Sequence, residues 1–421
     1  MNRTLKILFN ILRISLGLYF IFSGFVKGID PLGSAYKFND YFTAMGVASE
    51  LPQLTLIMSF LLSGAEFLIG FALVSGVFMN LTTWSALIFM LFFTTVTLLL
   101  AITNLVSDCG CFGDAIKLTN WQTFYKNLFT LPFVLFIFFR RKHFSFKSPI
   151  HVEWSLTVIA IITFFCISIY SYRHLPIIDF MPYSLGANIH DNMIIPEGAP
   201  KEVTEIKLLY KNNKSGKVTA FTMNDYPWQD SVNWKWTETK TVVIKEGYIP
   251  PIHDFVISDS NGTEITNSIL ADTSYSFLFI VYDVIKANPK ALIEAEKLSG
   301  LCMVSGKCKF YAITKSTSTD INKIRAKTGI NYPFCSADGT ALKTIVRANP
   351  GLLLIKNGTI VGKWHYNDFK NIDFKVKNFE SGNIIQLRKL KEKYHSLVIL
   401  FGLGFVCSLI WAISLYIKNK Q

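Results

Sequence analysis

The sequence predicts a polytopic α-helical membrane protein that carries a soluble α/β domain in its C-terminal half. Three observations predict this fold class. Of the 421 residues, 51% are hydrophobic and only 17% are charged, against about 25% charged residues in an average soluble domain. Apolar stretches long enough to cross a bilayer recur before residue 175, and one more lies near the C-terminus. Between residues 173 and 395, polar turn residues return and no comparable stretch occurs.

Composition also narrows the function classes. A chain this apolar, with 36 Phe, is neither intrinsically disordered nor collagen-like. It has 42 Lys and Arg against 29 Asp and Glu, which gives a net charge of +13. In a membrane protein we expect such an excess to set the topology rather than to bind nucleic acid.

Six apolar segments reach the length of a transmembrane helix, about 20 residues. They are residues 7–26, 54–78, 81–105, 124–139 with its flanks, 154–172 and 397–417. The first ends in Ser-Gly-Phe-Val-Lys-Gly rather than at a small-residue cleavage site, so we expect it to be retained. The predicted domains are a four-helix membrane domain (1–145), a fifth transmembrane helix (153–173), a β-rich lead-in (174–248), an α/β domain (249–380) and a sixth transmembrane helix (396–417).

Positive residues in short loops predict the orientation. Residues 140–142 follow the fourth helix, and Arg3 and Lys6 precede the first, so both groups mark the cytoplasmic side. The loop after the third helix and the soluble domain then face outward, which predicts a multi-pass protein of the bacterial inner membrane with a periplasmic domain. The basic residues at 388–393 disagree, but long translocated domains largely escape the charge rule.

Two charged residues lie inside the predicted spans. Arg13 is near the cytoplasmic end of the first helix, from where its side chain can reach the membrane surface. Glu66 is in the middle of the second helix, where a carboxylate needs a partner, a proton or a cavity. Both are candidate binding residues, and a purely structural hydrogen bond is the alternative.

Two of the seven cysteines, Cys109 and Cys111, stand in Asp-Cys-Gly-Cys-Phe-Gly-Asp directly after the third predicted helix. A bridge between them would close a very small, strained ring, for which Gly110 permits the turn, and such bridges are readily reduced. This favours a redox pair. Asp108 and Asp114 would raise the pKa of the thiols, which argues against a nucleophile. An inert turn and a metal site are the alternatives, and because further ligands are lacking nearby we expect no metal.

At this point the chain resembles a known family. Arg13-Ile-Ser-Leu-Gly-Leu-Tyr-Phe-Ile-Phe-Ser-Gly-Phe-Val-Lys27, followed by Asp30-Pro31, resembles the opening of the DoxX family. Glu66-Phe-Leu-Ile-Gly-Phe-Ala-Leu73 and the Cys-Gly-Cys-Phe-Gly loop resemble the second helix and the loop motif of its MauE branch, within about residues 5–140. MauE-type proteins of methylamine utilisation are implicated in maturing periplasmic enzymes rich in disulfides, and DoxX relatives in membrane-bound redox complexes. The resemblance therefore implies a redox role.

The soluble half begins with alternating apolar and polar residues at 202–210 and 217–222, and Asn213-Lys-Ser-Gly216 between them predicts a hairpin turn. From residue 250 onward, strands and helices alternate, which predicts a compact α/β layer. The predicted strands are 276–282, 310–314, 351–355 and 360–364, and the predicted helices are 289–298 and 320–328.

Residues 249–375 resemble the thioredoxin-like fold, especially its membrane-tethered periplasmic members. The likeness rests on an Asp-Phe…Asn-Gly lead-in, on Asn349-Pro350 before a buried strand, and on an Asn-Gly hairpin. It implies that Pro350 is a cis-proline bordering the face that binds partners. One departure matters, because the Cys-x-x-Cys of this family belongs where the chain has Asp283-Val-Ile-Lys-Ala-Asn288. A thioredoxin reaction through that motif is therefore not expected.

The remaining cysteines are assigned as follows. Cys302, Cys308 and Cys335 are candidates for a structural disulfide on the oxidising side, and their connectivity stays open. Cys166 and Cys407 lie within predicted membrane helices, where a thiol acts as a small apolar group.

These observations lead to one hypothesis and two rivals. The hypothesis is a DoxX/MauE-like membrane protein, with a degenerate thioredoxin-like domain, that supports periplasmic thiol–disulfide chemistry or redox-enzyme maturation through Cys109 and Cys111. The first rival is a non-enzymatic scaffold whose thioredoxin-like domain binds a protein partner, and the second is transport through the helices. The expected partners are membrane lipid and a periplasmic protein, without nucleic acid. No cofactor motif is evident, and a quinone near Glu66 rests on analogy alone.

Overall fold

The structure, a computed structural model, describes residues 3–47, 52–106, 108–143, 149–201, 203–245 and 247–371. The sixth predicted helix, the basic residues at 388–393, Cys407 and the predicted end of the α/β domain at residue 380 lie outside this part of the chain. The chain divides into two compact units, one formed by residues 1–187 and 256–421 and the other by residues 188–255.

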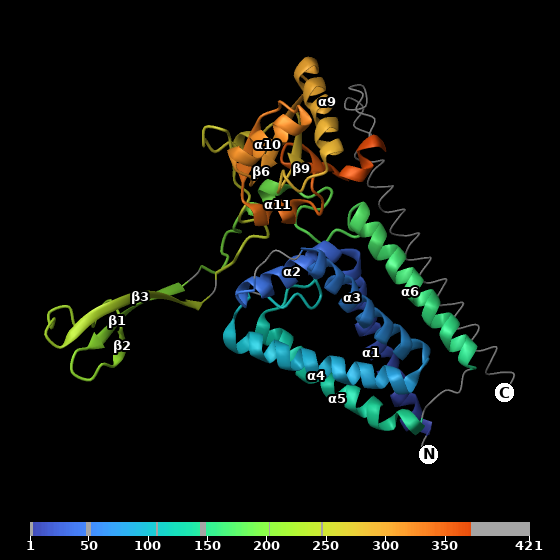
Figure 1. Ribbon diagram of the computed structural model, residues 1–421. Helices are drawn as coiled ribbons and strands as arrows, with labels where there is room; N and C mark the ends of the chain where they lie inside the picture. Colours follow the sequence, from blue (N-terminus) through green and yellow to red (C-terminus); the bar gives the residue numbers. More distant parts are fainter. Residues whose placement is uncertain are drawn as a thin grey trace. The chain divides into compact units, whose positions relative to one another are not determined.

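Five helices of the described residues are long and apolar enough to cross a membrane. They are α1 (Arg3–Ile29), α3 (Pro52–Ser75), α4 (Met79–Thr103), α5 (Asn120–Arg140) and α6 (Ile150–Arg173) (Figure 1). The five spans predicted before residue 175 are confirmed, and the protein is a multi-pass membrane protein. Large apolar side chains such as Leu81, Ile88 and Ile102 are more than 60% exposed, as expected for side chains that face lipid.

A sixth helix in this half, α2 (Pro31–Ala44), was not predicted. Asp30 caps it, since one carboxylate oxygen accepts a hydrogen bond from the backbone N–H of Gly33 at 2.9 Å, and Pro31 occupies the first helical turn. Because α2 is short and polar on one side, a search for apolar stretches does not detect it.

Glycines let two of the membrane helices pack closely. A Cβ atom built on Gly24 of α1 would lie 2.5 Å from the backbone nitrogen of Phe67 in α3, and one built on Gly70 of α3 would lie 2.5 Å from that of Ile21. Small residues at such positions allow close backbone approach in membranes, where van der Waals packing drives helix association. These glycines therefore bring the backbones of α1 and α3 into direct contact.

The soluble part of the same unit is a six-stranded mixed sheet with strand order β4-β7-β6-β5-β8-β9. Its strands are β4 (Ile257–Ser258), β5 (Tyr275–Ile280), β6 (Cys308–Thr314), β7 (Phe334–Ala337), β8 (Gly351–Lys356) and β9 (Thr359–His365). Strands β5, β6 and β7 run parallel to one another, and β4, β8 and β9 pair with their neighbours in antiparallel fashion. In the central register, Phe277 lies between Phe310 and Leu354.

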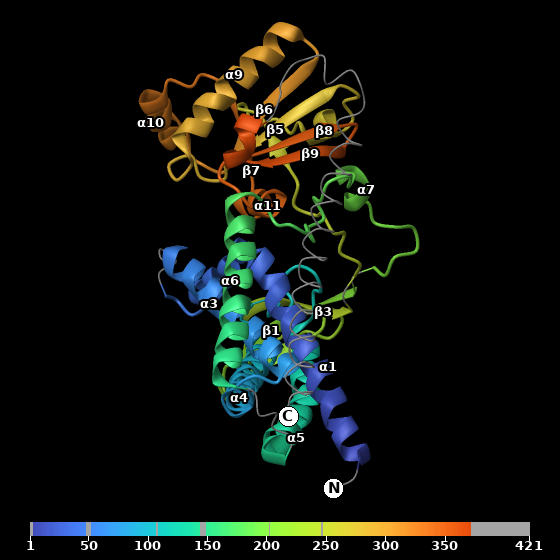
Figure 2. The same cartoon turned by 90° about the vertical axis from the view of Figure 1, so that its right-hand side faces the viewer.

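Helices cover both faces of this sheet. The helices are α8 (Thr266–Leu270), α9 (Pro289–Ser305), α10 (Ser318–Thr328) and α11 (Gly339–Ile345), and Figure 2 shows α9 lying across one face. Leu292 of α9 and Ile324 of α10 pack with Phe277 and Phe279 in one core, while Leu278 and Ile280 are equally buried and point to the other face. The predicted thioredoxin-like α/β fold is confirmed by this strand order, including the cis peptide bond between Asn349 and Pro350.

The second unit is the predicted β-rich segment. Strands β1 (Val203–Asn212), β2 (Val218–Phe221) and β3 (Trp234–Lys245) form an antiparallel sheet in the order β2-β1-β3, after the short helix α7 (Ile189–Met193). The predicted turn at 213–216 joins β1 to β2, with Leu208 opposite Phe221.

The close α1–α3 contact gives a prediction about stability. Gly70→Ala should destabilise the protein by about 1–3 kcal/mol, because the added methyl group overpacks a backbone-to-backbone contact. Gly300→Ala in α9 is the matched control, since a Cβ atom there meets nothing within 4 Å. It should instead stabilise α9 by about 0.5–1 kcal/mol. Heat-induced unfolding of the full chain in detergent measures both, and equal effects of the two changes would contradict the packing argument.

Candidate dithiol site

The structure brings Cys109 and Cys111 together in the loop between α4 and α5. Their Sγ atoms lie 3.1 Å apart, and both side chains are half-buried. Gly110 and Gly113 have φ angles of +65° and +53°, in the left-handed region that glycine adopts without strain. The turn at Gly110 lets two side chains that are two residues apart face each other. The predicted pair is thus a dithiol whose sulfur atoms are within hydrogen-bond distance.

Helix α2 holds the first half of this loop. Lys37 forms an ion pair with Asp108, and the Tyr41 hydroxyl donates a hydrogen bond to the carbonyl oxygen of Cys109 at 2.9 Å. The Lys37 stem also packs over Gly110, with its Cγ 3.2 Å from where a Cβ would stand. The unpredicted helix α2 therefore supports the first half of the loop that carries the cysteine pair.

A buried polar cluster from the membrane helices lies against the second half of the loop. The hydroxyl oxygen of Ser23 on α1 is 2.9 Å from the carbonyl oxygen of Cys111 and 3.2 Å from Glu66 Oε2 on α3. Glu66 forms an ion pair with Lys27, and less than a tenth of either side chain is exposed. The partner that Glu66 was expected to need is thus Lys27, and Ser23 links this pair to the backbone of Cys111.

Lysines near the thiols favour the thiolate form of Cys111. Its pKa is lowered to about 6, first by the hydrogen bond from the Cys109 thiol and then by the positive charges of Lys126 and Lys27, against the opposing effect of burial. The Lys126 ammonium, on α5, lies 4.5 Å from the centre of the Phe112 ring. The pKa of Cys109 is raised, because its proton is held by Cys111 and because it is buried.

The expectation that Asp108 and Asp114 would raise the pKa of both thiols is wrong for Cys111. Lys37 neutralises Asp108, and Arg347 binds Asp114 at 2.8 Å. The hydrogen bond from Cys109 and the charges of Lys126 and Lys27 therefore lower the pKa of Cys111, while the two acidic residues of the loop have ion-pair partners of their own.

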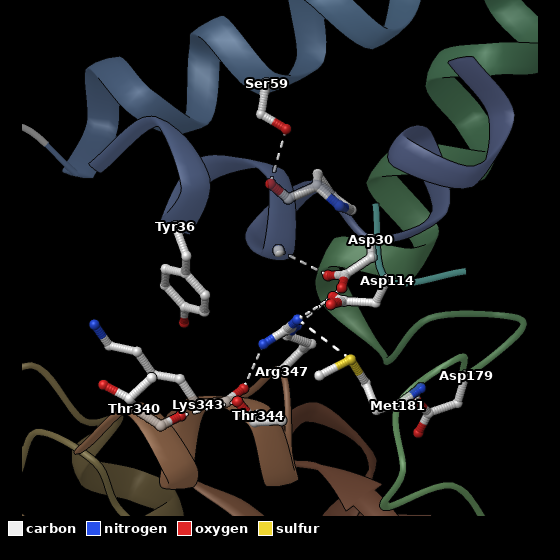
Figure 3. A network of polar contacts seen from close by, with 12 residues as sticks. Asp30, Tyr36, Ser59, Asp114, Asp179, Met181, Thr340, Lys343, Thr344 and Arg347 are labelled. Atoms are coloured by element: carbon white, nitrogen blue, oxygen red, sulfur yellow. Dashed lines mark hydrogen bonds and ion pairs between the residues drawn. The ribbon is translucent and has the colours of Figure 1, made fainter. Parts of the chain in front are cut away.

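Arg347 connects the sheet domain to this loop (Figure 3). Its Nε donates to Asp30 Oδ2 at 2.9 Å, its Nη2 donates to Asp114 Oδ2 at 2.8 Å, and its Nη1 donates to the carbonyl oxygen of Lys343 at 2.6 Å. The arginine side chain is only 8% exposed. Burial opposes its charge, but the two carboxylates outweigh burial and raise the pKa of Arg347.

A second contact joins α2 to the sheet domain. The hydroxyl oxygens of Tyr36 and Tyr282 lie 3.3 Å apart, and the Lys343 ammonium lies 4.9 Å from the centre of the Tyr36 ring. Tyr282 directly precedes the segment 283–288, where the resemblance would have placed a Cys-x-x-Cys motif. The sheet domain thus meets α2 at the position where relatives of its fold would carry their own thiols.

The other predicted site residues lie elsewhere. Arg13 donates hydrogen bonds to the carbonyl oxygens of Leu73 and Val74 at the end of α3, ten residues before Ser23 on α1, so it is not part of the dithiol site. At about 1.5 Å per helical residue this is roughly 15 Å along α1. Pro350 is buried, and along the chain it lies between Arg347 and the start of β8.

Of the three cysteines in the sheet domain, the structure brings Cys302 and Cys308 together. The Cys302 thiol is hydrogen-bonded to Cys308, which lowers the pKa of Cys308 to about 7. Cys335, on β7, lies apart; its pKa is raised by burial and by the nearby Asp259. In the part of the chain that the structure describes, no group of three or more His, Cys, Asp or Glu residues could hold a metal ion.

Comparison with protein families finds two matches. Residues 5–140 match the family of methylamine utilisation protein MauE, a range that begins within α1 and contains α2 to α5 and the dithiol loop. Residues 204–246 match a domain of unknown function, DUF8463, which contains most of the three-stranded sheet. No curated protein matches the chain.

Several solved structures are similar to part of the chain. A candidate protein disulfide isomerase from Bacteroides thetaiotaomicron is 19% identical and covers 34% of this chain and 89% of its own, with a TM-score of 0.23. A candidate thiol:disulfide interchange protein DsbE from Chlorobium tepidum is 15% identical and covers 32% and 92%, with a TM-score of 0.23. The peroxidoxin BcpB from Mycobacterium tuberculosis is 16% identical and covers 28% and 88%, with a TM-score of 0.23. The fold assignment rests on the strand order itself.

The geometry predicts an unusually acidic thiol at Cys111. Alkylation of Cys111 in the full chain should reach half its maximal rate near pH 6, because the thiolate is the reactive form and its pKa is about 6. Cys109→Ala should move this midpoint upward, since the hydrogen bond from Cys109 is the largest cause of the lowered pKa. Rates are read by mass spectrometry of the labelled peptides, with Cys335 as the internal reference of raised pKa. A midpoint near pH 9 in the parent protein would contradict the assignment.

Proposed function

We propose that this protein exchanges disulfides with a client protein at the outer surface of the bacterial inner membrane, through Cys109 and Cys111. The observation that carries the proposal is the pair of sulfur atoms 3.1 Å apart, in which the hydrogen bond from Cys109 lowers the pKa of Cys111. The match of residues 5–140 to MauE, together with the resemblance of the same helices to DoxX proteins, supports a role in redox chemistry or in enzyme maturation.

The stabilised thiolate favours one direction of exchange. A low thiol pKa stabilises the reduced form of a dithiol, and the corresponding disulfide is therefore a stronger oxidant. The strain expected for a Cys-Gly-Cys ring acts in the same direction. The proposed activity is therefore oxidation of client dithiols by the bridged form of the loop.

The exchange balances without another reactant. A client thiolate attacks Cys109 Sγ, a client–Cys109 bond forms, and the Cys109–Cys111 bond breaks with Cys111 leaving as the thiolate. A second client thiolate then attacks the client sulfur of the mixed disulfide and releases Cys109, which takes up a proton. Two electrons pass from the client to the loop, the client gains a disulfide, and the loop ends as the reduced dithiol of this structure. Cys109 is the attacked sulfur because the thiol of lower pKa is the better leaving group.

The rest of the protein supplies position and recognition. The Lys and Arg residues that flank α1 and α5 support a periplasmic position of the dithiol loop, under the positive-inside rule. The sheet domain lacks cysteines at 283–288, so its proposed part is to bind the client and to support the loop rather than to exchange electrons.

Trapping tests the exchange directly. Cys111→Ala cannot form the loop disulfide, so its Cys109 can join a client only by attacking a client disulfide, which is the release step in reverse. The mixed disulfide should then accumulate in acid-quenched membranes, because no Cys111 thiol is left to displace the client. Cys109→Ala, the matched variant, should give none, because it removes the sulfur to which the client is joined. The measurement is the shift of the protein to higher mass on a non-reducing gel, with its loss on reduction.

One result would favour the rival function. If both variants give no mixed disulfide and keep full activity in cells, the dithiol does not exchange with proteins. A scaffold whose sheet domain binds a protein partner would then account better for the fold.

A further inference from the structure

The dithiol loop is held at both ends, and the two ends are held by different parts of the protein. Its beginning is bound by α2 through the Lys37–Asp108 ion pair and the Tyr41 hydrogen bond. Its end, at Asp114, is bound to the side chain of Arg347, which comes from the segment between α11 and β8 of the sheet domain. The membrane helices alone therefore do not complete the support of the loop.

Arg347 is placed to act as a bridge rather than as a single ion pair. Its Nε–H and one Nη–H group bind two different carboxylates, Asp30 at the start of α2 and Asp114 at the end of the loop (Figure 3). The second carboxylate oxygen of Asp30 caps α2 at 2.9 Å, so this aspartate cannot swing away without uncapping the helix. Without the guanidinium, two partly buried carboxylates, 18% and 22% exposed, would face each other and repel.

We propose that Arg347 of the thioredoxin-like domain is a positioning residue of the membrane dithiol, which fixes the Cys109–Cys111 geometry by holding Asp114 against Asp30. The sheet domain thereby forms part of the site instead of lying beside it. The inference deepens the proposed function, on which it rests in treating Cys109 and Cys111 as the reacting pair.

Few residues separate the contact of Arg347 with Asp114 from the two thiols. Asp114 is three residues after Cys111, and turn hydrogen bonds from the N–H of Gly113 to Gly110 and from the N–H of Ala115 to Phe112 connect it to the dithiol. Releasing Asp114 frees this half of the loop to move, and the sulfur–sulfur hydrogen bond is the contact most sensitive to such movement. The titratable groups that interact with the Cys111 thiol are Cys109 of the loop, Lys126 of α5, Lys27 and Tyr19 of α1, Tyr41 of α2 and Glu66 of α3. Arg347 therefore acts on the thiol through the loop.

The test measures the pH dependence of Cys111 alkylation in the full chain, in detergent. Arg347→Met should raise the pH of half-maximal rate by about one unit, which corresponds to a tenfold change in the ionisation constant. Asp114→Asn should raise it by a similar amount, and the double variant should show no further rise, because both changes break the same contact. Arg347→Lys should give an intermediate rise of the midpoint, since a lysine ammonium keeps the charge but cannot donate to two carboxylates from separate nitrogen atoms.

Lys363→Met is the matched control. The Lys363 side chain is 7% exposed and binds Asp179 at 2.6 Å. Asp179 accepts a hydrogen bond from the backbone N–H of Met181, whose sulfur contacts Arg347. The loss of Lys363 therefore removes an equally buried ion pair next to Arg347 while it keeps the Arg347 contacts to Asp30 and Asp114. It should leave the alkylation midpoint of Cys111 unchanged even where it lowers the unfolding temperature as much as Arg347→Met does.

Two results would overturn the proposal. One is an unchanged midpoint in folded Arg347→Met and Asp114→Asn proteins, which would reduce Arg347 to a contact that only joins two domains. The other is an equal rise in Lys363→Met, which would reveal a general effect of instability. If Arg347→Met does not fold, Asp114→Asn alone decides, because it keeps the Arg347–Asp30 pair. A failure to trap clients with a clear midpoint shift would refute the proposed function and leave the positioning role intact.

Discussion

The site depends on one interaction, the sharing of the Arg347 guanidinium between Asp30 and Asp114. It joins three pieces of chain: the start of α2, the end of the dithiol loop and the sheet domain. A buried guanidinium is stable only when its donors are satisfied, and here a backbone carbonyl takes the remaining nitrogen at 2.6 Å. Because removing one partner strands the others as buried charges, this contact is costly to break and therefore well suited to fixing geometry.

A second set of buried charges, Lys27 and Glu66, also helps to fix the position of the loop. An ion pair such as Lys27–Glu66 inside a membrane helix bundle gains little net stability, since removal of both charges from water offsets their attraction. Its placement is more informative than its energy. Ser23 connects the pair to the carbonyl oxygen of Cys111, so the pair fixes the loop from the membrane side and adds the positive charge of Lys27 near the thiolate.

Much of the fold could be predicted, because apolar stretches of bilayer length and alternating strands are local patterns. Helix α2 was not predicted because it is short and polar on one side. Strand β7 was not predicted because it has only four residues. The pairing of Cys109 with Cys111 was visible from their spacing. The lowered pKa of Cys111 was not, because it depends on Lys126 and Lys27 of other helices, and the loop itself is held by Arg347, which is 233 residues away from Asp114 along the chain. Contacts of that range leave no trace in a single sequence.

These contacts give the membrane helices and the sheet domain different parts in the site. The sheet domain keeps a thioredoxin-like strand order but has no cysteine at residues 283–288, and Tyr282, beside that segment, instead meets Tyr36 of α2. The sulfur atoms are supplied by the membrane loop, and the sheet domain supplies Arg347. A dithiol in a flexible loop would lose the hydrogen bond that stabilises its thiolate. Cys109 and Cys111, on either side of Gly110, cannot hold this geometry by themselves. The attachment of the loop to a rigid α/β domain through Arg347 keeps the two sulfur atoms in place.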